Sequence, residues 1–163
     1  MSRAESYGLS PSAERVQLAL DAAGIALHVR ELSQSTRTAQ DAALTIGREV
    51  GQIVKSLIFR DVNSGGAVLI LACGSNRVDV PKVSAAIGHK LSKADADFVQ
   101  ERTGFAIGGV PPVGHSSAIE TYVDSELMNY GVIWAAAGTP RAVFSLTPQQ
   151  LLQLTGAKVI GIC

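Results

Sequence analysis

The apolar positions along the chain follow a helical period in some segments and a strand period in others. Apolar residues at helical spacing, most often with Ser, Thr or Asp at the start and Gly at the end, predict helices. These helices span residues 10–24, 36–47, 79–88, 93–102 and 147–154. Shorter apolar runs predict strands. These strands span residues 25–29, 53–59, 67–73, 118–123, 131–136, 142–145 and 158–162.

The strands at 53–59 and 67–73 are separated by Asn63–Ser64–Gly65–Gly66, a strong turn sequence that predicts a hairpin. Ala, Val, Leu and Ile dominate a chain that is 47% hydrophobic and only 5% aromatic. No repeat or linker divides its 163 residues. We therefore expect residues 1–163 to form a single compact α+β domain, with a mixed, mainly antiparallel sheet surrounded by helices.

The charge balance limits the class of partner. The chain carries 14 basic and 14 acidic residues, so its formal net charge is zero. Proteins that coat nucleic acid tightly and nonspecifically usually show a basic excess. The balance argues against such a role, but it permits a brief contact with one RNA end through a local basic patch.

The two cysteines, Cys73 and Cys163, belong to no CxxC or His-rich motif. The sequence therefore predicts neither a zinc site nor a disulfide framework. Met1 to Ser10 contains no apolar stretch of the kind found in signal peptides, and no apolar run reaches the roughly 18 residues of a membrane span. A cytoplasmic protein without a membrane segment is expected.

Lys55 is embedded in an apolar strand. A strand lysine is most often an outward-facing surface residue. Strand alternation, however, puts Lys55 on one face with Ile53, Leu57 and Phe59. A lysine among large hydrophobic side chains can instead reach a cavity, where it would bind a phosphate, a carboxylate or an oxyanion. Both interpretations remain open from the pattern alone.

The segment from Gly104 to His115 is too rich in Gly and Pro for regular structure. It is either a simple connector or a rigid loop whose backbone N–H groups are directed at a ligand. Gly108 and Gly109 allow close backbone approach, whereas Pro111 and Pro112 restrict the loop. His115 follows the loop, and a lone histidine is more often structural than catalytic. No Ser/His/Asp set, reactive cysteine or carboxylate pair accompanies it; Asp124 is best interpreted as a helix cap.

Taken together, these segments resemble the YbaK/EbsC family, the free-standing relatives of the editing domain inserted in bacterial prolyl-tRNA synthetases. The resemblance runs from about Ser12 to the C-terminus. The family lysine matches Lys55, and the family's Gly-x-x-x-Pro loop matches Gly108 to Pro112. The other matching segments are Thr38 to Ala43, the strand 53–59, residues 79–82, the loop 103–115, Asp124 with Leu127, and residues 136–138.

The resemblance implies hydrolysis of the ester between a small amino acid and tRNA, without a metal or organic cofactor. The amino acid would be Cys, Ala, Ser, Thr or a similar residue, with tRNA(Pro) as the first candidate. The chemistry would be largely substrate-assisted. The implied catalytic residues are Lys55, Gly108 and Gly109. The implied substrate-binding residues are Ile53, Leu57, Val110, Pro111, Pro112, His115 and Gly138. The partner would be the acceptor end of aminoacyl-tRNA, and an aminoacyl-tRNA synthetase is a second candidate partner.

The loop departs from some family members, because it reads Gly-Val-Pro between Gly108 and Pro112. Pro111 has no N–H to donate there, which leaves the donor set and the choice of amino acid open. Two other functions also remain open: a non-catalytic module that binds a tRNA end or a synthetase, and a hydrolase of small free esters or thioesters.

Overall fold

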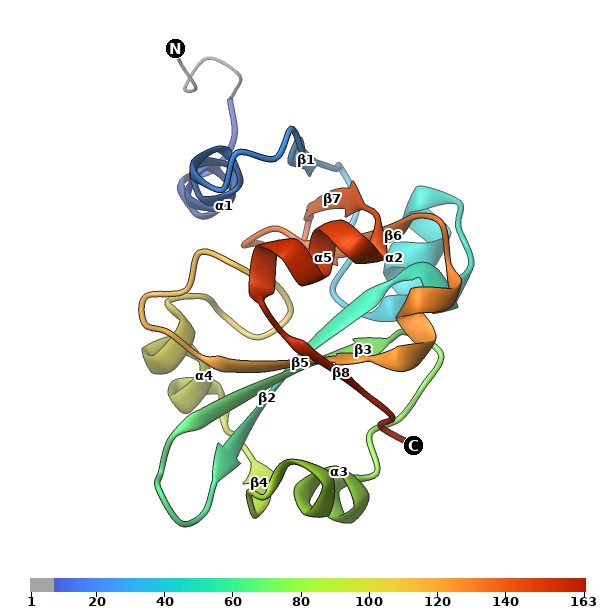
Figure 1. Ribbon diagram of the computed structural model, residues 1–163. Coiled ribbons are helices and arrows are strands. Elements are labelled where there is room, and N and C mark those ends of the chain that lie inside the picture. The colour runs from blue at the N-terminus through green and yellow to red at the C-terminus, as the bar shows by residue number, and fades with distance from the viewer. Residues whose placement is uncertain (1–7) are drawn as a thin grey trace.

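The computed structural model describes residues 8–163, in which the strands form two sheets (Figure 1). Residues 1–7, most of the segment examined for a signal peptide, lie outside the described residues. The five-stranded sheet has the order β4 (Leu91–Lys93), β2 (Val54–Asp61), β3 (Ala67–Cys73), β5 (Glu120–Asp124) and β8 (Lys158–Ile160). The three-stranded sheet has the order β1 (Arg30–Glu31), β7 (Ala142–Leu146) and β6 (Ile133–Ala136).

Strand pairing is mixed and mainly antiparallel. The pairs β2–β3, β2–β4, β1–β7 and β6–β7 are antiparallel, whereas β3–β5 and β5–β8 are parallel. The predicted fold class, a single α+β domain with such pairing, is therefore confirmed. The sequence did not indicate that the strands divide between two sheets, which touch through a parallel bridge between Ile53 and Trp134.

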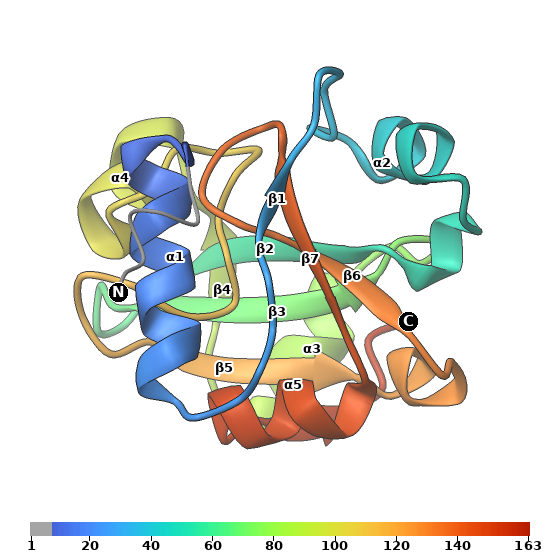
Figure 2. The ribbon, with the colours of Figure 1, turned by 90° about the horizontal axis from the view of Figure 1, so that it is seen from above.

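The helices cover both faces of the larger sheet. They are α1 (Pro11–Ala22), α2 (Ala39–Ile46), α3 (Val80–Ile87), α4 (Ala96–Thr103) and α5 (Pro148–Thr155), with short 3-10 helices η2 (Val50–Gln52) and η3 (Ser125–Asn129). Helix α3 lies on one face, while α1, α5 and the three-stranded sheet lie on the other (Figures 1 and 2). No helix within residues 8–163 has both the length and the apolar character to cross a bilayer.

Strand β3 is the centre of the core. Leu69 and Leu71 pack beneath α1, α5 and the smaller sheet, while Val68, Ile70 and Ala72 pack against α3. A strand covered on both faces must be apolar at every position rather than at alternate ones. This explains the uninterrupted run of apolar residues that predicts β3.

Residues 25–29 are not the strand that the sequence predicts. Leu27 and Val29 are buried as expected, but the side chain of Gln17 replaces a neighbouring strand. Its amide nitrogen donates to the Leu27 carbonyl at 2.9 Å, and its oxygen accepts from the Val29 N–H at 2.8 Å. Buried backbone groups need partners, and one glutamine on α1 supplies them without a sheet.

The predicted helix 93–102 begins later, at Ala96, with Asp95 as its cap. The preceding residues form β4, which the sequence did not indicate. A three-residue strand is too short to show alternation, and β4 exists because Phe59 to Asp61 offer it an open edge.

A cluster of titratable side chains joins β2, β5 and the loop before β4. The Nδ1 and Nε2 atoms of His89 each lie 2.8 Å from a carboxylate oxygen, of Asp61 and Glu120 respectively. Glu120 also accepts from the Tyr122 hydroxyl. The hydrogen bond to Glu120, supported by Asp61, raises the pKa of His89 against the opposing effect of partial burial. The pKa of Asp61 is lowered, mainly by the Asn63 N–H, and that of Glu120 mainly by Tyr122.

We expect the contribution of His89 to stability to depend on pH. Because its pKa is raised in the folded protein, the contribution is complete below the ordinary pKa of 6.5 and is lost as pH rises through the raised value. Both carboxylates have lowered pKa values, so they stay ionised at about pH 5.5. His89→Gln should therefore lower the free energy of unfolding, measured in urea, more at about pH 5.5 than at about pH 8.5.

The control for this experiment is His28→Gln, which removes an imidazole from an exposed position. A loss of stability in His89→Gln that stays constant from about pH 5.5 to about pH 8.5 would contradict the ion-pair interpretation.

Candidate active site

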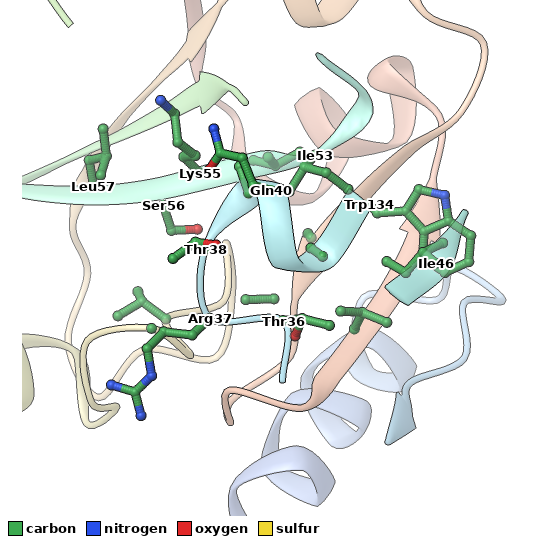
Figure 3. Close-up of a pocket in the computed structure, with 18 of the residues that line it drawn as sticks. Thr36, Arg37, Thr38, Gln40, Ile46, Ile53, Lys55, Ser56, Leu57 and Trp134 are labelled. Atoms are coloured by element: carbon green, nitrogen blue, oxygen red, sulfur yellow. The ribbon is translucent and has the colours of Figure 1, made fainter. Parts of the chain in front are cut away.

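A cavity of about 420 Å³ lies where α2, the beginning of β2, β6 and the Gly/Pro loop meet. This volume is within the range of small-molecule sites. The lining residues come from residues 36–46, 53–57, 107–110, 134–136 and Val143. Figure 3 shows labelled lining residues from the segment before α2, from α2 itself, from β2 with the preceding Ile53, and from β6, with Ser56 on one side of the β2 ribbon and Lys55 and Leu57 on the other.

The cavity exists because β2 and β6 meet and then separate. They touch at the bridge between Ile53 and Trp134, and β4 pairs with β2 only from Phe59 onward. Between these two points, the edge of β2 that faces away from β3 has no neighbouring strand among residues 8–163. Ser56 lies in the middle of this gap.

The backbone of Ser56 faces the open edge. The Asp61 N–H donates toward the β3 side, to Gly66, and the Val62 N–H donates toward the β4 side, to Lys90. Backbone groups alternate in direction along a strand, so those of Ser56 point away from β3. The Ser56 Oγ is buried and has no hydrogen-bond partner among residues 8–163. Buried hydroxyl groups are normally satisfied, so Ser56 offers an unpaired hydroxyl to a ligand in the cavity.

Lys55 lines the same cavity and is half-buried. Its Nζ donates to the carbonyl oxygen of Asn76, in the turn after β3. The Asn76 side chain donates in turn to Asp124, at 2.9 Å. The Asp124 carboxylate is 1% exposed and also accepts the N–H groups of Cys73 and Glu126. Asp124 is thus the predicted cap, and it also anchors the turn that holds Lys55.

The Gly/Pro loop presents two free amides beside the cavity. The Gly109 N–H donates to the Ala106 carbonyl at 3.1 Å, and the Gly109 carbonyl accepts from Gly138 at 2.8 Å. The N–H groups of Gly108 and Val110 have no acceptor among the described residues. Gly108 has φ of 94°, a conformation that only glycine adopts readily.

The lining of the cavity is electropositive. It contains the cations of Lys55 and Arg37 and no carboxylate or histidine. Arg37 is exposed, and its aliphatic part packs beside Gly108: a Cβ atom on Gly108 would lie 3.0 Å from the Arg37 Cγ. Such a lining favours an anionic or strongly polar ligand.

Five residues with expected site roles line the cavity: Ile53, Lys55, Leu57, Gly108 and Val110. The other five lie outside its lining: Gly109, Pro111, Pro112, His115 and Gly138. Gly109 and Gly138 support the loop from behind. A Cβ on Gly138 would lie 2.6 Å from the Ser12 carbonyl oxygen, and one on Gly109 would lie 2.8 Å from the Thr139 Cα.

His115 holds the loop rather than lining the cavity. Its Nε2 lies 2.7 Å from the Pro111 carbonyl oxygen, which can only accept, so Nε2 carries the hydrogen. Burial lowers the pKa of His115, and the hydrogen bond to Pro111 opposes this shift. His115 and Pro112 line a second, more open hollow on the other side of the loop.

Arg37, Thr38, Ser56 and Trp134 also line the cavity, although we expected no site role for them from the sequence. Of Thr36 and Thr38, the two caps that the sequence allows for this helix, Thr38 is the one used, since its Oγ1 accepts the Asp41 N–H at 3.0 Å. Arg37 directly precedes that cap and lies just outside the family-like segment that begins at Thr38, so no feature of the sequence marks it. Nothing in the local pattern marks Ser56, because its role depends on the missing strand beside it.

Residues 8–163 contain no group of three or more His, Cys, Asp or Glu side chains suited to holding a metal ion. The groups that the cavity offers are backbone amides, hydroxyl groups and two cations.

Comparisons with known proteins agree with these features. A family model described as the aminoacyl-tRNA editing domain matches residues 33–154. The chain is 35% identical over 136 residues to the uncharacterized protein YwhH of Bacillus subtilis, covering 83% of this chain and 86% of YwhH. It is 28% identical over 131 residues to EbsC of Enterococcus faecalis, named as a candidate Cys-tRNA(Pro)/Cys-tRNA(Cys) deacylase, covering 80% of this chain and 79% of EbsC.

A crystal structure of a candidate trans-editing enzyme for prolyl tRNA synthetase matches with a TM-score of 0.89 and 52% sequence identity. The match covers 95% of this chain and 98% of that chain. The resemblance inferred from the sequence signatures is therefore confirmed.

We expect Gly109→Ala to destabilise the protein by about 1–3 kcal/mol, because the added methyl group would meet the backbone of Thr139 and force the loop apart. The measurement is the free energy of unfolding in urea. Gly131→Ala is the matched control, since a Cβ at Gly131 meets nothing within 4 Å. Equal stability of Gly109→Ala and the control would show that the loop does not depend on this contact.

Proposed function

The chain belongs to the aminoacyl-tRNA editing domain family, and on this premise we propose that it is a trans-acting deacylase. Its substrate would be tRNA mischarged with a small amino acid such as Cys, Ala, Ser or Thr, with tRNA(Pro) as the first candidate. The observation that carries the proposal is the cavity itself, which combines two cations, two free loop amides and no carboxylate.

The reaction would be addition of water to the ester carbonyl, followed by cleavage of the bond to the ribose oxygen. The cavity lining has no Asp, Glu or His that could act as a general base. A hydroxyl group of the terminal ribose would therefore orient the water. The proton lost by the water would return to the ribose oxygen as it leaves, so that the products are the free amino acid and intact tRNA.

The loop amides would stabilise the tetrahedral oxyanion. Preorganised N–H donors are the usual means of stabilising such a charge. Gly108 and Val110 are the donors we propose, because Gly109 already donates to Ala106 and Pro111 has no N–H. This proposal replaces Gly109, which the sequence resemblance paired with Gly108, by Val110.

Lys55 would bind the terminal nucleotide through its ribose or phosphate. The contact with Asn76 holds its ammonium group in one position beside the cavity, which limits the entropy lost on binding. The Asp124 network behind Asn76 would act through this turn, as a support for the lysine.

The remaining assignments follow from this function. Its partner would be the acceptor end of aminoacyl-tRNA, and a synthetase that supplies the mischarged tRNA is a further candidate. The protein would act in the cytoplasm without a metal or organic cofactor.

The direct test is deacylation of a panel of mischarged tRNAs beside the corresponding aminoacyl ethyl esters. Ile53, Leu57 and Val110, with Trp134, restrict the volume of the cavity. We expect small residues to be hydrolysed and Phe or Trp to be rejected, with alanine, serine and cysteine separated by only about 1–3 kcal/mol. Efficient hydrolysis of phenylalanyl-tRNA would exclude this pocket as the amino acid site. Equal activity on simple esters would instead favour a hydrolase of small free esters.

Lys55→Ala should lower kcat/KM for the best tRNA substrate by about 10- to 100-fold, the cost of one charge-assisted contact to phosphate or oxyanion. Lys158→Ala is the matched control, because Lys158 is an exposed lysine on β8, the third strand from β2 in the sheet. Urea denaturation would verify that both variants fold. Wild-type deacylation by folded Lys55→Ala would remove Lys55 from the mechanism.

A further inference from the structure

We propose that Arg37 is a phosphate-binding residue that contacts the last phosphodiester of the tRNA, the one on the 5′ side of the terminal adenosine. This inference rests on the proposed function and adds a second contact to the same site. No motif or matched family residue assigned a role to Arg37.

The charge of the cavity favours an anionic ligand. In a chain with zero net charge, the lining contains two cations and no carboxylate. Aliphatic walls around unopposed positive charge raise the local potential and favour an anion. The only anionic groups near an aminoacyl ester on tRNA are the phosphodiesters of the backbone, since the amino acid carries an ammonium group.

Arg37 lies beside the Gly/Pro loop. In Figure 3, Arg37 lies on the same side of β2 as Thr38 and Ser56, whereas the side chain of Lys55 rises from the opposite side of the strand. The aliphatic part of Arg37 packs beside Gly108 of the loop, and the residue is exposed, so its guanidinium is accessible to solvent. A ligand whose ester contacts Gly108 would therefore lie close to Arg37.

The two cations differ in how free they are to bind a ligand. Lys55 is half-buried, and its ammonium group already donates to Asn76. Arg37 is exposed, and within residues 8–163 its guanidinium has no ion pair or hydrogen bond. A phosphodiester stays largely hydrated, and the exposed, bidentate guanidinium suits it better than a half-buried ammonium group does. Lys55 is then left to contact the terminal ribose and the ester.

The beginning of α2 reinforces the charge of Arg37. Thr38 caps the helix, and the N–H groups of Ala39 and Gln40 have no acceptor among the described residues. The helix dipole adds partial positive charge at this end. Asp41 lies in the same turn, but it forms no ion pair with Arg37 within 4.0 Å. Asp41 therefore does not engage the guanidinium in an ion pair.

The test compares two substrates that differ in this phosphodiester. The first is an aminoacyl minihelix ending in CCA, and the second is the matching 2′(3′)-O-aminoacyl adenosine, which has no phosphate. Arg37→Gln keeps the Cβ and Cγ atoms that pack beside Gly108 but removes the charge. We expect its loss of kcat/KM, relative to wild type, to be about tenfold larger on the minihelix than on the adenosine ester, mainly through KM.

Two comparisons separate this contact from other effects. Lys158→Gln removes one surface charge far from the cavity and should change neither substrate. Lys55→Ala should lose activity on both substrates, because its contact is with the terminal nucleoside. Equal losses of Arg37→Gln on both substrates, or no loss on the minihelix, would overturn the assignment of Arg37.

A binding measurement keeps the inference testable apart from catalysis. The wild-type protein and Arg37→Gln are each titrated with the trinucleotide CpCpA and with adenosine. We expect Arg37→Gln to raise the Kd for CpCpA by about tenfold. The slope of log Kd against log salt concentration should fall by roughly 0.7, the value for one phosphate contact on a single strand. An unchanged slope would overturn the inference. If the wild-type protein hydrolyses neither substrate but CpCpA binding still depends on Arg37, the deacylase function fails while the phosphate contact stands.

Discussion

Only one edge of strand β2 is fully paired with another strand, and the cavity depends on the gap along its other edge. Its pairing with β3 runs from Val54 to Arg60, whereas the other edge meets β6 at one bridge and β4 at its far end. A continuous neighbour would have closed the sheet and buried the gap. Because β6 instead turns away into a second sheet, the backbone and hydroxyl of Ser56 face a cavity. The unpaired edge is stable because α2 and the Gly/Pro loop shield it from other chains.

The buried carboxylate of Asp124 connects this edge to the core. It has no cationic partner among its contacts, and three N–H groups, from Cys73, Asn76 and Glu126, compensate for its burial. Two of these donors lie at the end of β3 and in the turn that accepts the ammonium of Lys55. The same hydrogen bonds that end the central strand therefore fix the lysine. Loss of the carboxylate would leave buried donors unpaired, so stability and site geometry cannot be separated at this position.

The sequence predicts the fold better than the site, for physical reasons. Helix caps such as Thr38 and Thr147, and the two-faced apolar run of β3, are local signals, and the structure has these elements. Residues 25–29 form no strand because the side chain of Gln17 satisfies their backbone, and the short β4 forms because it pairs with the edge of β2. Both partners are distant in the sequence, so no local pattern reveals either outcome.

The same distinction holds within the site. Lys55 and Gly108 stand out because their residue types are unusual for their surroundings, and both line the cavity. Gly109 and Gly138 have the same signal for a different reason: they leave room for neighbouring backbone rather than for a ligand. Arg37 and Ser56 carry no signal, because only the divergence of β2 from β6 gives them a cavity to face.

The neutral charge of the chain fits an editing role better than a basic surface would. A strongly basic protein binds every tRNA through its phosphates, and most charged tRNAs must not be hydrolysed. Two cations without a carboxylate in the cavity would attract the single-stranded end, while a Debye length of about 8 Å screens the more distant phosphates of the polyanion. Under the proposed function, discrimination would then fall on the volume of the cavity beyond the ester. Weak binding of the tRNA body and steric rejection of large side chains would act together, because neither alone would protect correctly charged tRNA.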